Sequence, residues 1–330
     1  MNINHIAIVG LGSIGSRYLR LIKSNYPNIE ITLVRSGKGL SYPEEMLADR
    51  VVKSINDLMP LGVKSAIISS PATQHIKQAS ALVNDGIHTL IEKPLSHSLD
   101  GVSDLVKYLN EKNITVLVGY VLRHDPVLKK IKNHIDNGLI GEITFVKIDC
   151  GSFLPDWRPG QNYKETVSAS KNLGGGVLLE LSHELDYLRW LFGDISSVYA
   201  NLPKTGILGV EVEESADLII ETVKGFTVSV HLDFNRKLSS RNCTVYGANG
   251  EMSLDLIKRK ISLNISGEDK KVESFNYERD DLFLSQIEHF FDCVENNKPP
   301  KVDVEDAFET TRLIDASKKS NETGRRIYLN

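Results

Sequence analysis

Cysteine is scarce in this chain of 330 residues. The three cysteines, Cys150, Cys243 and Cys293, are odd in number and lie far apart in the sequence. A disulfide framework needs an even set, and a two-pair zinc site needs two closely spaced pairs, so the sequence indicates neither. Such sparing use of cysteine is typical of the reducing cytoplasm, where we expect this protein to work. We also expect no metal ion in its site.

An excess of positive charge is also missing. Lysine and arginine number 39 against 43 for aspartate and glutamate, which leaves a net charge of −4 at pH 7. Nucleic acids and anionic membranes attract positively charged surfaces, so neither is an expected partner. No uncharged apolar run approaches the length of about 20 residues that spans a membrane. No basic segment of a signal peptide precedes the apolar run at 6–9.

The first third of the chain alternates short apolar runs with longer amphipathic segments. The apolar runs are continuous, which is typical of strands covered on both faces of a parallel sheet. The expected strands are 6–9, 29–34, 65–69, 88–91 and 115–118, and the expected helices are 14–22, 74–83 and 102–109. This order predicts an α/β domain of βαβ units, a Rossmann fold, over residues 1–122.

Beyond residue 123 the pattern changes to an α+β one. After helices expected at 126–135 and 178–191, five apolar segments follow one another through turns with no helix between them. These segments are 195–202, 212–222, 226–234, 243–246 and 261–265, and two further helices are expected at 282–295 and 304–318. Because 330 residues exceed what one core usually organises, we predict a second domain, residues 123–330, with a large, mainly antiparallel open sheet.

Three glycines follow the first expected strand in the pattern G-x-G-x-x-G. Gly10 permits a tight turn, Gly12 lets the backbone approach a pyrophosphate, and Gly15 lets the helix pack closely on the strand. Ser13 and Ile14 lie between them at the start of the first helix, whose amide groups favour negative charge. In this context the pattern predicts a dinucleotide cofactor, NAD or NADP.

The residue that chooses between these two cofactors is expected at the end of the second strand. An acidic residue there accepts the ribose hydroxyls of NAD, but Arg35 stands in its place. Ser36 and Lys38 follow, and a guanidinium, a hydroxyl and an ammonium together suit a 2′-phosphate. We therefore predict that NADP is favoured. The alternative is that Arg35 only stacks on the adenine and accepts either cofactor.

Glu92, Lys93 and Pro94 directly follow the expected strand 88–91. Because open α/β sheets bind ligands at the carboxyl ends of their strands, we expect Lys93 at the ligand. Partial burial beside a cofactor favours the neutral form of a lysine, which can then take part in proton transfer. The alternative is a surface lysine paired with Glu92.

The helix expected at 178–191 follows three consecutive glycines, 174–176. At about 100° per residue, one face carries four leucines that are expected to pack, namely Leu178, Leu181, Leu185 and Leu188. A different face carries four polar side chains, namely Glu180, His183, Glu184 and Tyr187. We expect this second face to serve a site in which His183 transfers a proton. The alternative is a core histidine that is hydrogen-bonded to a neighbour.

The segment 156–164 is irregular and rich in hydrogen-bond donors. Its aromatic and basic side chains, Trp157, Arg158 and Tyr163, suit a polyhydroxylated or anionic ligand. The alternative is an exposed polar loop. Arg123 could reach the same ligand, or it could form a structural ion pair.

Several short motifs occur together in this chain. They are the glycine fingerprint, Ser-Pro-Ala-Thr-Gln-His at 70–75, Glu-Lys-Pro at 92–94, Gly-Tyr at 119–120, Arg123, Gly-Leu-Ile-Gly-Glu-Ile at 138–143, and the segment from the glycines at 174–176 through His183 to Asp186. With these motifs the sequence resembles the Gfo/Idh/MocA oxidoreductase family, named for glucose–fructose oxidoreductase and inositol dehydrogenase. The resemblance covers nearly the whole chain.

The resemblance implies roles for individual residues. In that family the lysine of the Glu-Lys-Pro motif contacts a substrate hydroxyl, and a histidine on the later helix assists proton transfer, which assigns these roles to Lys93 and His183. Cofactor contacts are implied for Ser70, Pro71, His75, Glu92 and Lys93, and a substrate contact for Tyr120. Many members carry an aspartate four residues before the histidine. Here the nearest acid, Glu180, stands three before it and could orient His183 or bind a hydroxyl.

We therefore expect an NAD(P)-dependent oxidoreductase that moves a hydride between nicotinamide and a ring carbon. The segments 156–164 and 174–183 resemble members associated with surface-polysaccharide sugars, which implies a sugar, sugar derivative or nucleotide sugar as substrate. Two alternatives are a cofactor-binding sensor without turnover and an enzyme that uses NAD transiently for hydrolysis or epimerisation. An exposed face of the second sheet suits self-association, so we expect a homodimer or homotetramer.

Overall fold

The computed structural model describes residues 3–37 and 41–329. The chain forms two compact units, of which the first combines Met1–Val121 with Glu278–Thr311 and the second combines Leu122–Tyr277 with Arg312–Asn330. The chain therefore passes between the units three times. The predicted division after residue 122 lies beside the first passage. It places 278–311 in the second domain, whereas these residues pack with the first unit.

A parallel sheet of six strands forms the centre of the first unit, which confirms the predicted Rossmann fold. The strands are β1 (His5–Val9), β2 (Glu30–Val34), β3 (Arg50–Val52), β4 (Ser65–Ile68), β5 (His88–Glu92) and β6 (Val116–Gly119). Their order, β3-β2-β1-β4-β5-β6, is that of a dinucleotide-binding fold and reverses direction at β1 and β4. Val9 pairs with both Val34 and Ile68, so β1, β2 and β4 end side by side.

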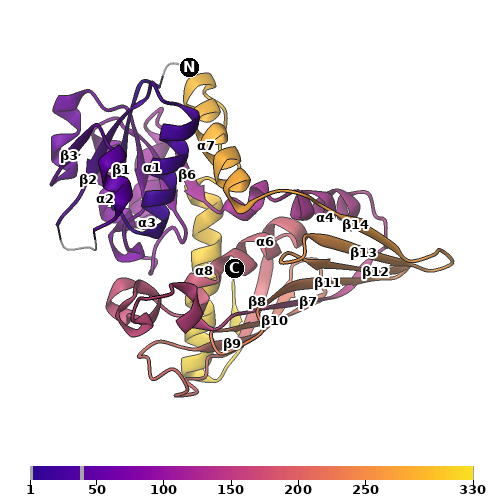
Figure 1. Cartoon of the computed structure of the whole chain (residues 1–330). Helices are drawn as coiled ribbons and strands as arrows, with labels where there is room; N and C mark the ends of the chain where they lie inside the picture. The colour runs from indigo at the N-terminus through magenta and orange to yellow at the C-terminus, as the bar shows by residue number, and fades with distance from the viewer. Residues whose placement is uncertain (1–2, 38–40, 330) are drawn as a thin grey trace. The chain divides into compact units, whose positions relative to one another are not determined.

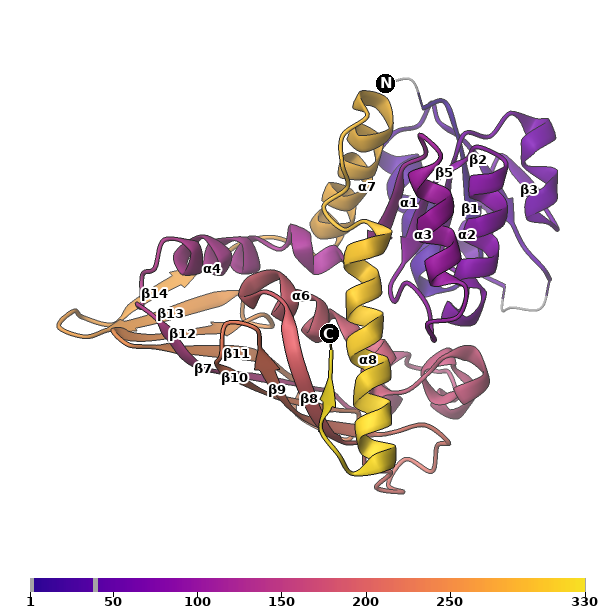
Figure 2. The ribbon, with the colours of Figure 1, turned by 180° about the vertical axis from the view of Figure 1, so that it is seen from behind.

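Helices cover both faces of this sheet (Figures 1 and 2). α1 (Ser13–Asn25) lies beside α7 (Arg279–Asn296), and α2 (His75–Asn84) lies beside α3 (Val102–Asn110). Four 3-10 helices complete the unit, namely η1 (Pro43–Leu47), η2 (Ile55–Asp57), η3 (Met59–Leu61) and η4 (Ala72–Gln74). α1 is amphipathic, with a buried side that includes Leu19 and Ile22. The last residue of every strand of this sheet except β3 is buried.

A sheet of nine strands forms the second unit. The strands are β7 (Ile143–Gly151), β8 (Ile195–Asn201), β9 (Ser215–Thr222), β10 (Thr227–Asp233), β11 (Ser240–Gly247), β12 (Gly250–Asp255), β13 (Lys260–Ile265), β14 (Lys271–Ser274) and β15 (Ile327–Tyr328). Their order is β14-β13-β12-β11-β7-β10-β9-β8-β15. Among the described residues only the β7–β10 pair is parallel, which confirms the prediction of a mainly antiparallel sheet.

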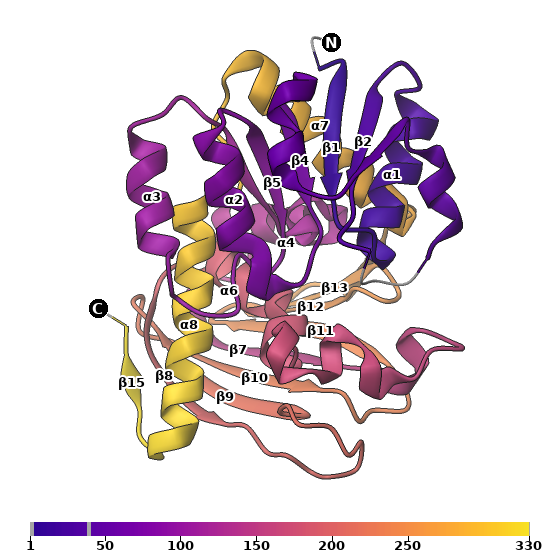
Figure 3. The ribbon, with the colours of Figure 1, turned by 90° about the vertical axis from the view of Figure 1, so that its left-hand side faces the viewer.

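Helices pack on this sheet from one side, where α4 (Pro126–Asp136), α5 (Val177–Glu180) and α6 (Ser182–Phe192) lie. α8 (Val304–Thr323) begins in the first unit and ends in the second, where the Ser320 hydroxyl accepts a hydrogen bond of 2.9 Å from the Ala200 amide of β8. Figure 3 shows β15 along the outer side of β8. The remaining short helices are η5 (Val121–His124), η6 (Leu154–Trp157), η7 (Tyr163–Glu165), η8 (Val167–Ala169) and η9 (Lys171–Leu173).

The other side of this sheet carries a network of charged side chains. His231 on β10 lies between two carboxylates, with Nδ1 2.6 Å from Asp217 and Nε2 3.2 Å from Asp233. Arg236 continues the network from Asp233, at 2.9 Å, to Asp149 on β7, at 3.1 Å. The hydrogen bonds to Asp233 and Asp217 raise the pKa of His231 to about 9. The imidazolium thus joins two neighbouring strands of the sheet.

This network predicts a pH dependence of stability. Because the folded state holds the His231 proton more tightly than the unfolded chain does, its contribution is complete below the ordinary pKa of 6.5, falls as the pH rises, and is lost above about 9. Urea unfolding at several pH values between 6 and 10 measures this contribution. We expect the free energy of unfolding to fall more steeply over this range in the native protein than in His231→Gln. Parallel curves for the two proteins would contradict the assignment.

Candidate active site

The glycine fingerprint forms an open turn between β1 and α1. Gly10 has a φ of +94°, and its amide donates to the Val34 carbonyl at 3.0 Å. A Cβ on Gly15 would lie 2.3 Å from the Gly10 carbonyl oxygen and 2.7 Å from Ser69 Oγ, so only glycine lets α1 pack this closely. A Cβ on Gly12 would meet nothing within 4 Å. The backbone at Gly12 therefore faces open space, as contact with a pyrophosphate requires.

The start of α1 suits the same ligand. Ser13 is exposed and Ile14 is half-buried in the first turn, and among the described residues no side chain caps the helix at Gly12. The first amide groups of the helix thus keep their capacity to bind an anion. These features fit a dinucleotide, as the sequence predicts.

Arg35 follows β2 and is fixed at its backbone, since its amide donates to the Val52 carbonyl at 2.9 Å. Its guanidinium forms an ion pair with Glu45 from η1. Ser36 is exposed next to it, whereas Lys38 lies outside the described residues. Glu45 could not be predicted as a partner of Arg35, because no local sequence pattern connects an acid on a 3-10 helix with the end of β2.

His75 connects the turns that follow β4 and β5. Its Nδ1 lies 2.8 Å from the Pro94 carbonyl oxygen, and its Nε2 lies 2.8 Å from that of Ser70. The side chain is buried, and burial lowers its pKa. His75 thus contacts protein backbone on both sides and positions the two turns, which differs from the direct cofactor contact that the resemblance implies. Pro71 is half-buried in the first of these turns.

Glu92 turns into the interior of the first unit. It accepts hydrogen bonds from the Tyr18 hydroxyl of α1 and from the Lys93 amide, the latter at 3.2 Å. Gln286 of α7 donates in turn to the Tyr18 hydroxyl at 2.6 Å. Burial raises the pKa of Glu92 and that of Tyr18. The Glu92 carboxylate therefore holds the backbone at Lys93. This role differs from the cofactor contact that was predicted for Glu92.

Lys93 itself is half-buried at the end of β5, and the peptide bond that joins it to Pro94 is cis. In the register of the sheet Glu92 lies beside Gly119, where a Cβ would come within 2.9 Å of the carboxylate. Tyr120, expected to contact a substrate, is buried in the hydrophobic core of the first unit.

In the second unit the predicted helix 178–191 is two helices, α5 and α6, that meet at Leu181, where φ is −99° and ψ is 26°. Glu180 ends α5 and His183 lies in the first turn of α6, and both side chains are half-buried. Glu184 and Tyr187 are fully buried, and the Glu184 carboxylate accepts two hydrogen bonds from Arg241, of 2.6 and 3.0 Å. The predicted polar face was therefore wrong for these two residues, because α6 is buried on most of its circumference and Glu184 pairs with Arg241 of the sheet.

Arg123 forms the structural ion pair that the sequence left open. Its guanidinium donates to both carboxylate oxygens of Asp186, each at 2.8 Å, and lies 5.2 Å from the ring centre of Trp190. Arg123 and Asp186 are both buried. The arginine thus stabilises α6 from the segment that precedes α4.

The three side chains singled out in the segment 156–164 contact their own unit. Trp157 donates to Ser152 Oγ at 2.8 Å, Arg158 to Ser168 Oγ at 3.4 Å, and Tyr163 to the Leu208 carbonyl at 2.9 Å. All three are half-buried, so part of each side chain stays accessible to a ligand. Their contacts fold the segment against neighbouring loops.

The glycines before α5 allow close packing of a carboxylate, that of Glu213, which was not predicted from the sequence. Gly176 has a φ of +111°, and a Cβ there would lie 2.4 Å from the Glu213 carboxylate. Glu213 accepts a hydrogen bond of 3.3 Å from the Leu178 amide, and burial raises its pKa. The repeated glycine therefore marks a close approach of Glu213 to the start of α5.

Comparison with known proteins identifies the class. Residues 4–120 match the family model of the oxidoreductase family with an NAD-binding Rossmann fold, and residues 132–329 match that of its C-terminal alpha/beta domain. The chain belongs to the Gfo/Idh/MocA oxidoreductase family. Within the described residues no helix is long and apolar enough to cross a membrane, and no group of potential ligands could hold a metal ion.

Individual relatives are distant in sequence. The chain is 23% identical to myo-inositol 2-dehydrogenase of Thermotoga maritima, with 98% of each protein covered. A levoglucosan dehydrogenase in complex with NADH has a similar structure, with a TM-score of 0.87, 16% identity and 99% of each chain covered. The WlbA dehydrogenase of Bordetella pertussis, in complex with NADH and UDP-GlcNAcA, has a TM-score of 0.82 and 20% identity over 99% of this chain and 97% of that one.

The different surroundings of Gly12 and Gly15 predict different outcomes of substitution. Gly12→Ala places a methyl group in open space, so we expect the free energy of unfolding to change by less than about 1 kcal/mol while NADH affinity falls at least about tenfold. Gly15→Ala forces α1 away from Gly10, so stability and affinity should both fall. Urea unfolding and NADH titration of both variants make the measurement. Unchanged NADH affinity in Gly12→Ala would show that this turn does not hold the pyrophosphate.

Proposed function

We propose that this protein is an NAD(P)-dependent dehydrogenase or reductase of a sugar, a sugar derivative or a nucleotide sugar. The observation that carries the proposal is the open glycine turn at the point where the strand order reverses, with Lys93 at the end of a strand on the same sheet. The names of its relatives include inositol, levoglucosan and UDP-GlcNAcA, and these compounds support the substrate class.

The residues of this chain would hold the cofactor and move one proton. Gly10, Gly12 and the first turn of α1 would bind the pyrophosphate, and the nicotinamide ring, when bound, supplies the hydride acceptor or donor. In the oxidation direction Lys93 accepts the proton of the substrate hydroxyl as hydride leaves the carbon that bears it. His183 assists this transfer, and Glu180 orients His183 or binds a second hydroxyl. Reduction follows the reverse course.

The substrate would be bound mainly by the second unit. Trp157 offers an apolar face to a sugar ring, and Arg158 and Tyr163 offer hydrogen-bond donors. Tyr120 and Arg123 are each buried within their own unit, and contact of either residue with a substrate stays a prediction. The three free cysteines are buried, as suits a protein of the reducing cytoplasm, where we propose that it works.

Substitution of Lys93 tests the mechanism. In Lys93→Ala we expect kcat to fall at least about 100-fold, because the hydroxyl proton loses its acceptor, while NADH affinity changes by less than about threefold. Lys107→Ala, an exposed lysine of α3, is the matched control and should behave like the native protein. A panel of free, phosphorylated and nucleotide-linked sugars, followed by nicotinamide absorbance, provides the assay.

The outcomes of this assay separate the functions. Full activity of Lys93→Ala would remove this residue from the mechanism. NADH binding by the native protein without an absorbance change on any sugar would favour a sensor or transient use of NAD. His183→Asn should also lower kcat, and the double variant should lose less than the product of the two single losses, because both residues act on one proton.

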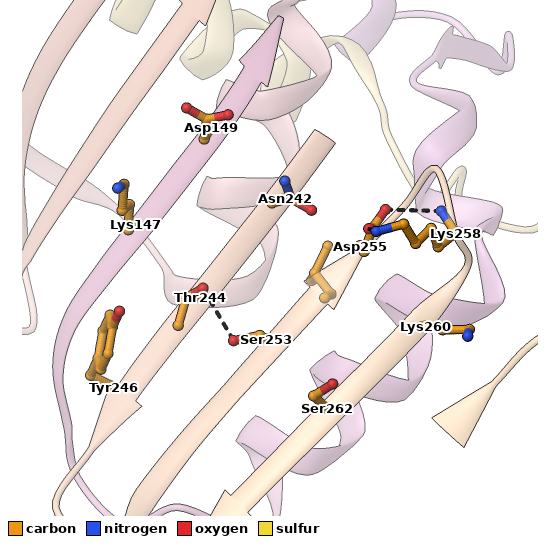
Figure 4. Close-up of a pocket in the computed structure, with 11 residues that line it drawn as sticks. Lys147, Asp149, Asn242, Thr244, Tyr246, Ser253, Asp255, Lys258, Lys260 and Ser262 are labelled. Atoms are coloured by element: carbon orange, nitrogen blue, oxygen red, sulfur yellow. Dashed lines mark hydrogen bonds and ion pairs between the residues drawn. The ribbon is translucent and has the colours of Figure 1, made fainter. Parts of the chain in front are cut away.

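We also propose that the protein forms a homodimer or homotetramer through the open face of the second sheet. This face carries both lysine and aspartate side chains, so a two-fold contact between identical copies can place a lysine of one copy against an aspartate of the other. Figure 4 shows a groove on it with Lys147 and Lys260 near Asp149 and Asp255. Thr244 and Ser253 are hydrogen-bonded across the middle of this groove at 3.2 Å.

Sedimentation of the native protein at micromolar concentration tests this assembly. We expect the mass of a dimer or tetramer. Lys147→Glu, which places a negative charge beside Asp149, should shift the distribution toward monomer, whereas Lys107→Glu in the first unit should not. A native protein that sediments as a monomer would overturn the proposal.

A further inference from the structure

The end of β2 carries a charge pair in place of a single charge. The Arg35 guanidinium, whose side chain is 13% exposed, pairs with the Glu45 carboxylate, which is 31% exposed. In dinucleotide-binding folds this is the strand end that faces the adenosine ribose. An approaching cofactor therefore meets both an arginine and an acid.

Glu45 is held beside Arg35 by η1, whose backbone is fixed by hydrogen bonds. Its amide donates to the Tyr42 carbonyl at 3.1 Å, and its carbonyl accepts from the Ala48 amide at 3.1 Å, which closes η1 on both sides. Asp49 then anchors the segment on β2, because its amide donates to the Ile31 carbonyl at 3.0 Å and its carboxylate accepts from the Ile31 amide at 2.7 Å. The Arg35–Glu45 pair is thus held by backbone contacts at both partners.

The pair changes what Arg35 can do for each cofactor. A 2′-phosphate needs the guanidinium as its partner, and Glu45 already accepts a hydrogen bond from one nitrogen of that group. Glu45 also adds a negative charge beside the place that a 2′-phosphate would take. A ribose 2′-hydroxyl carries no charge, and it can donate to the Glu45 carboxylate as it would to an acid at the end of β2.

We infer that Glu45 is the specificity-determining residue of the cofactor site and that its pairing with Arg35 makes the protein favour NAD over NADP. The inference rests on the proposed function, since it presumes that the glycine turn binds a nicotinamide dinucleotide. It reverses the preference for NADP that Arg35 alone predicts. The acid that is missing from the end of β2 is supplied by the element that follows it.

Direct titration of the full-length protein with NADH and with NADPH tests the inference, with nicotinamide fluorescence as the readout and no need for substrate. The native protein should bind NADH more tightly. In Glu45→Gln the ratio of the two dissociation constants should shift about tenfold toward NADPH, because the Arg35 guanidinium loses its ion pair with Glu45 and the repulsion is removed. Glu44→Gln, the neighbouring acid on η1, makes the same change in net charge and should leave the ratio unchanged.

The double variant Arg35→Gln/Glu45→Gln shows whether the gain passes through Arg35, since it should abolish the improved NADPH binding. A native preference for NADPH, or an unchanged ratio in Glu45→Gln, would overturn the inference while leaving the cofactor site intact. Failure of the native protein to bind either nucleotide would instead overturn the proposed function, and the inference with it. Thermal unfolding of each variant confirms that the comparison is made on folded protein.

Discussion

The hydrogen-bonded register of the parallel sheet is the constraint on which the proposed cofactor site depends. Parallel strands that pair in register must finish at one edge, and here Val9 pairs with Val34 and Ile68, which in turn pairs with Ile91. Segments that are far apart in the sequence therefore begin at neighbouring points. The glycine turn, the Arg35–Glu45 pair, the His75 contacts and Lys93 all occupy positions that this register dictates.

Three buried charged side chains of the described residues are satisfied by a partner on a different element. Glu92 accepts from Tyr18, Arg123 pairs with Asp186, and Glu184 pairs with Arg241. Burial of a charge without such a partner is costly, so each pair fixes the relative position of two elements. These pairs act on the proposed catalytic residues through the backbone. Glu92 orients the backbone at Lys93, and Asp186 and Glu184 anchor α6, the helix that carries His183.

Local patterns were sufficient for the fold class and for the glycine turn. Within the described residues, ten strands follow from apolar runs and turn residues, whereas β3, β7, β12, β14 and β15 were not predicted. Gly10, Gly12 and Gly15 are determined by local backbone geometry. Tertiary partners were beyond such patterns. Glu45, Gln286 and Glu213 meet their partners through contacts between distant segments, and the break at Leu181 depends on packing that no helical periodicity records. Glu184 and Tyr187 were assigned to a site although they belong to the core, because helical periodicity does not record that α6 is covered on more than one face.

The return of 278–311 to the first unit has a consequence for biosynthesis. A ribosome makes 1–121 first, whereas α7, which packs against α1, is synthesised only later. The Gln286 amide that donates to the Tyr18 hydroxyl belongs to this late helix. The dinucleotide-binding unit therefore cannot complete its packing as an early, independent domain. The packing of the first unit is completed only after 122–277 have been translated, so its maturation is coupled to translation of the second unit.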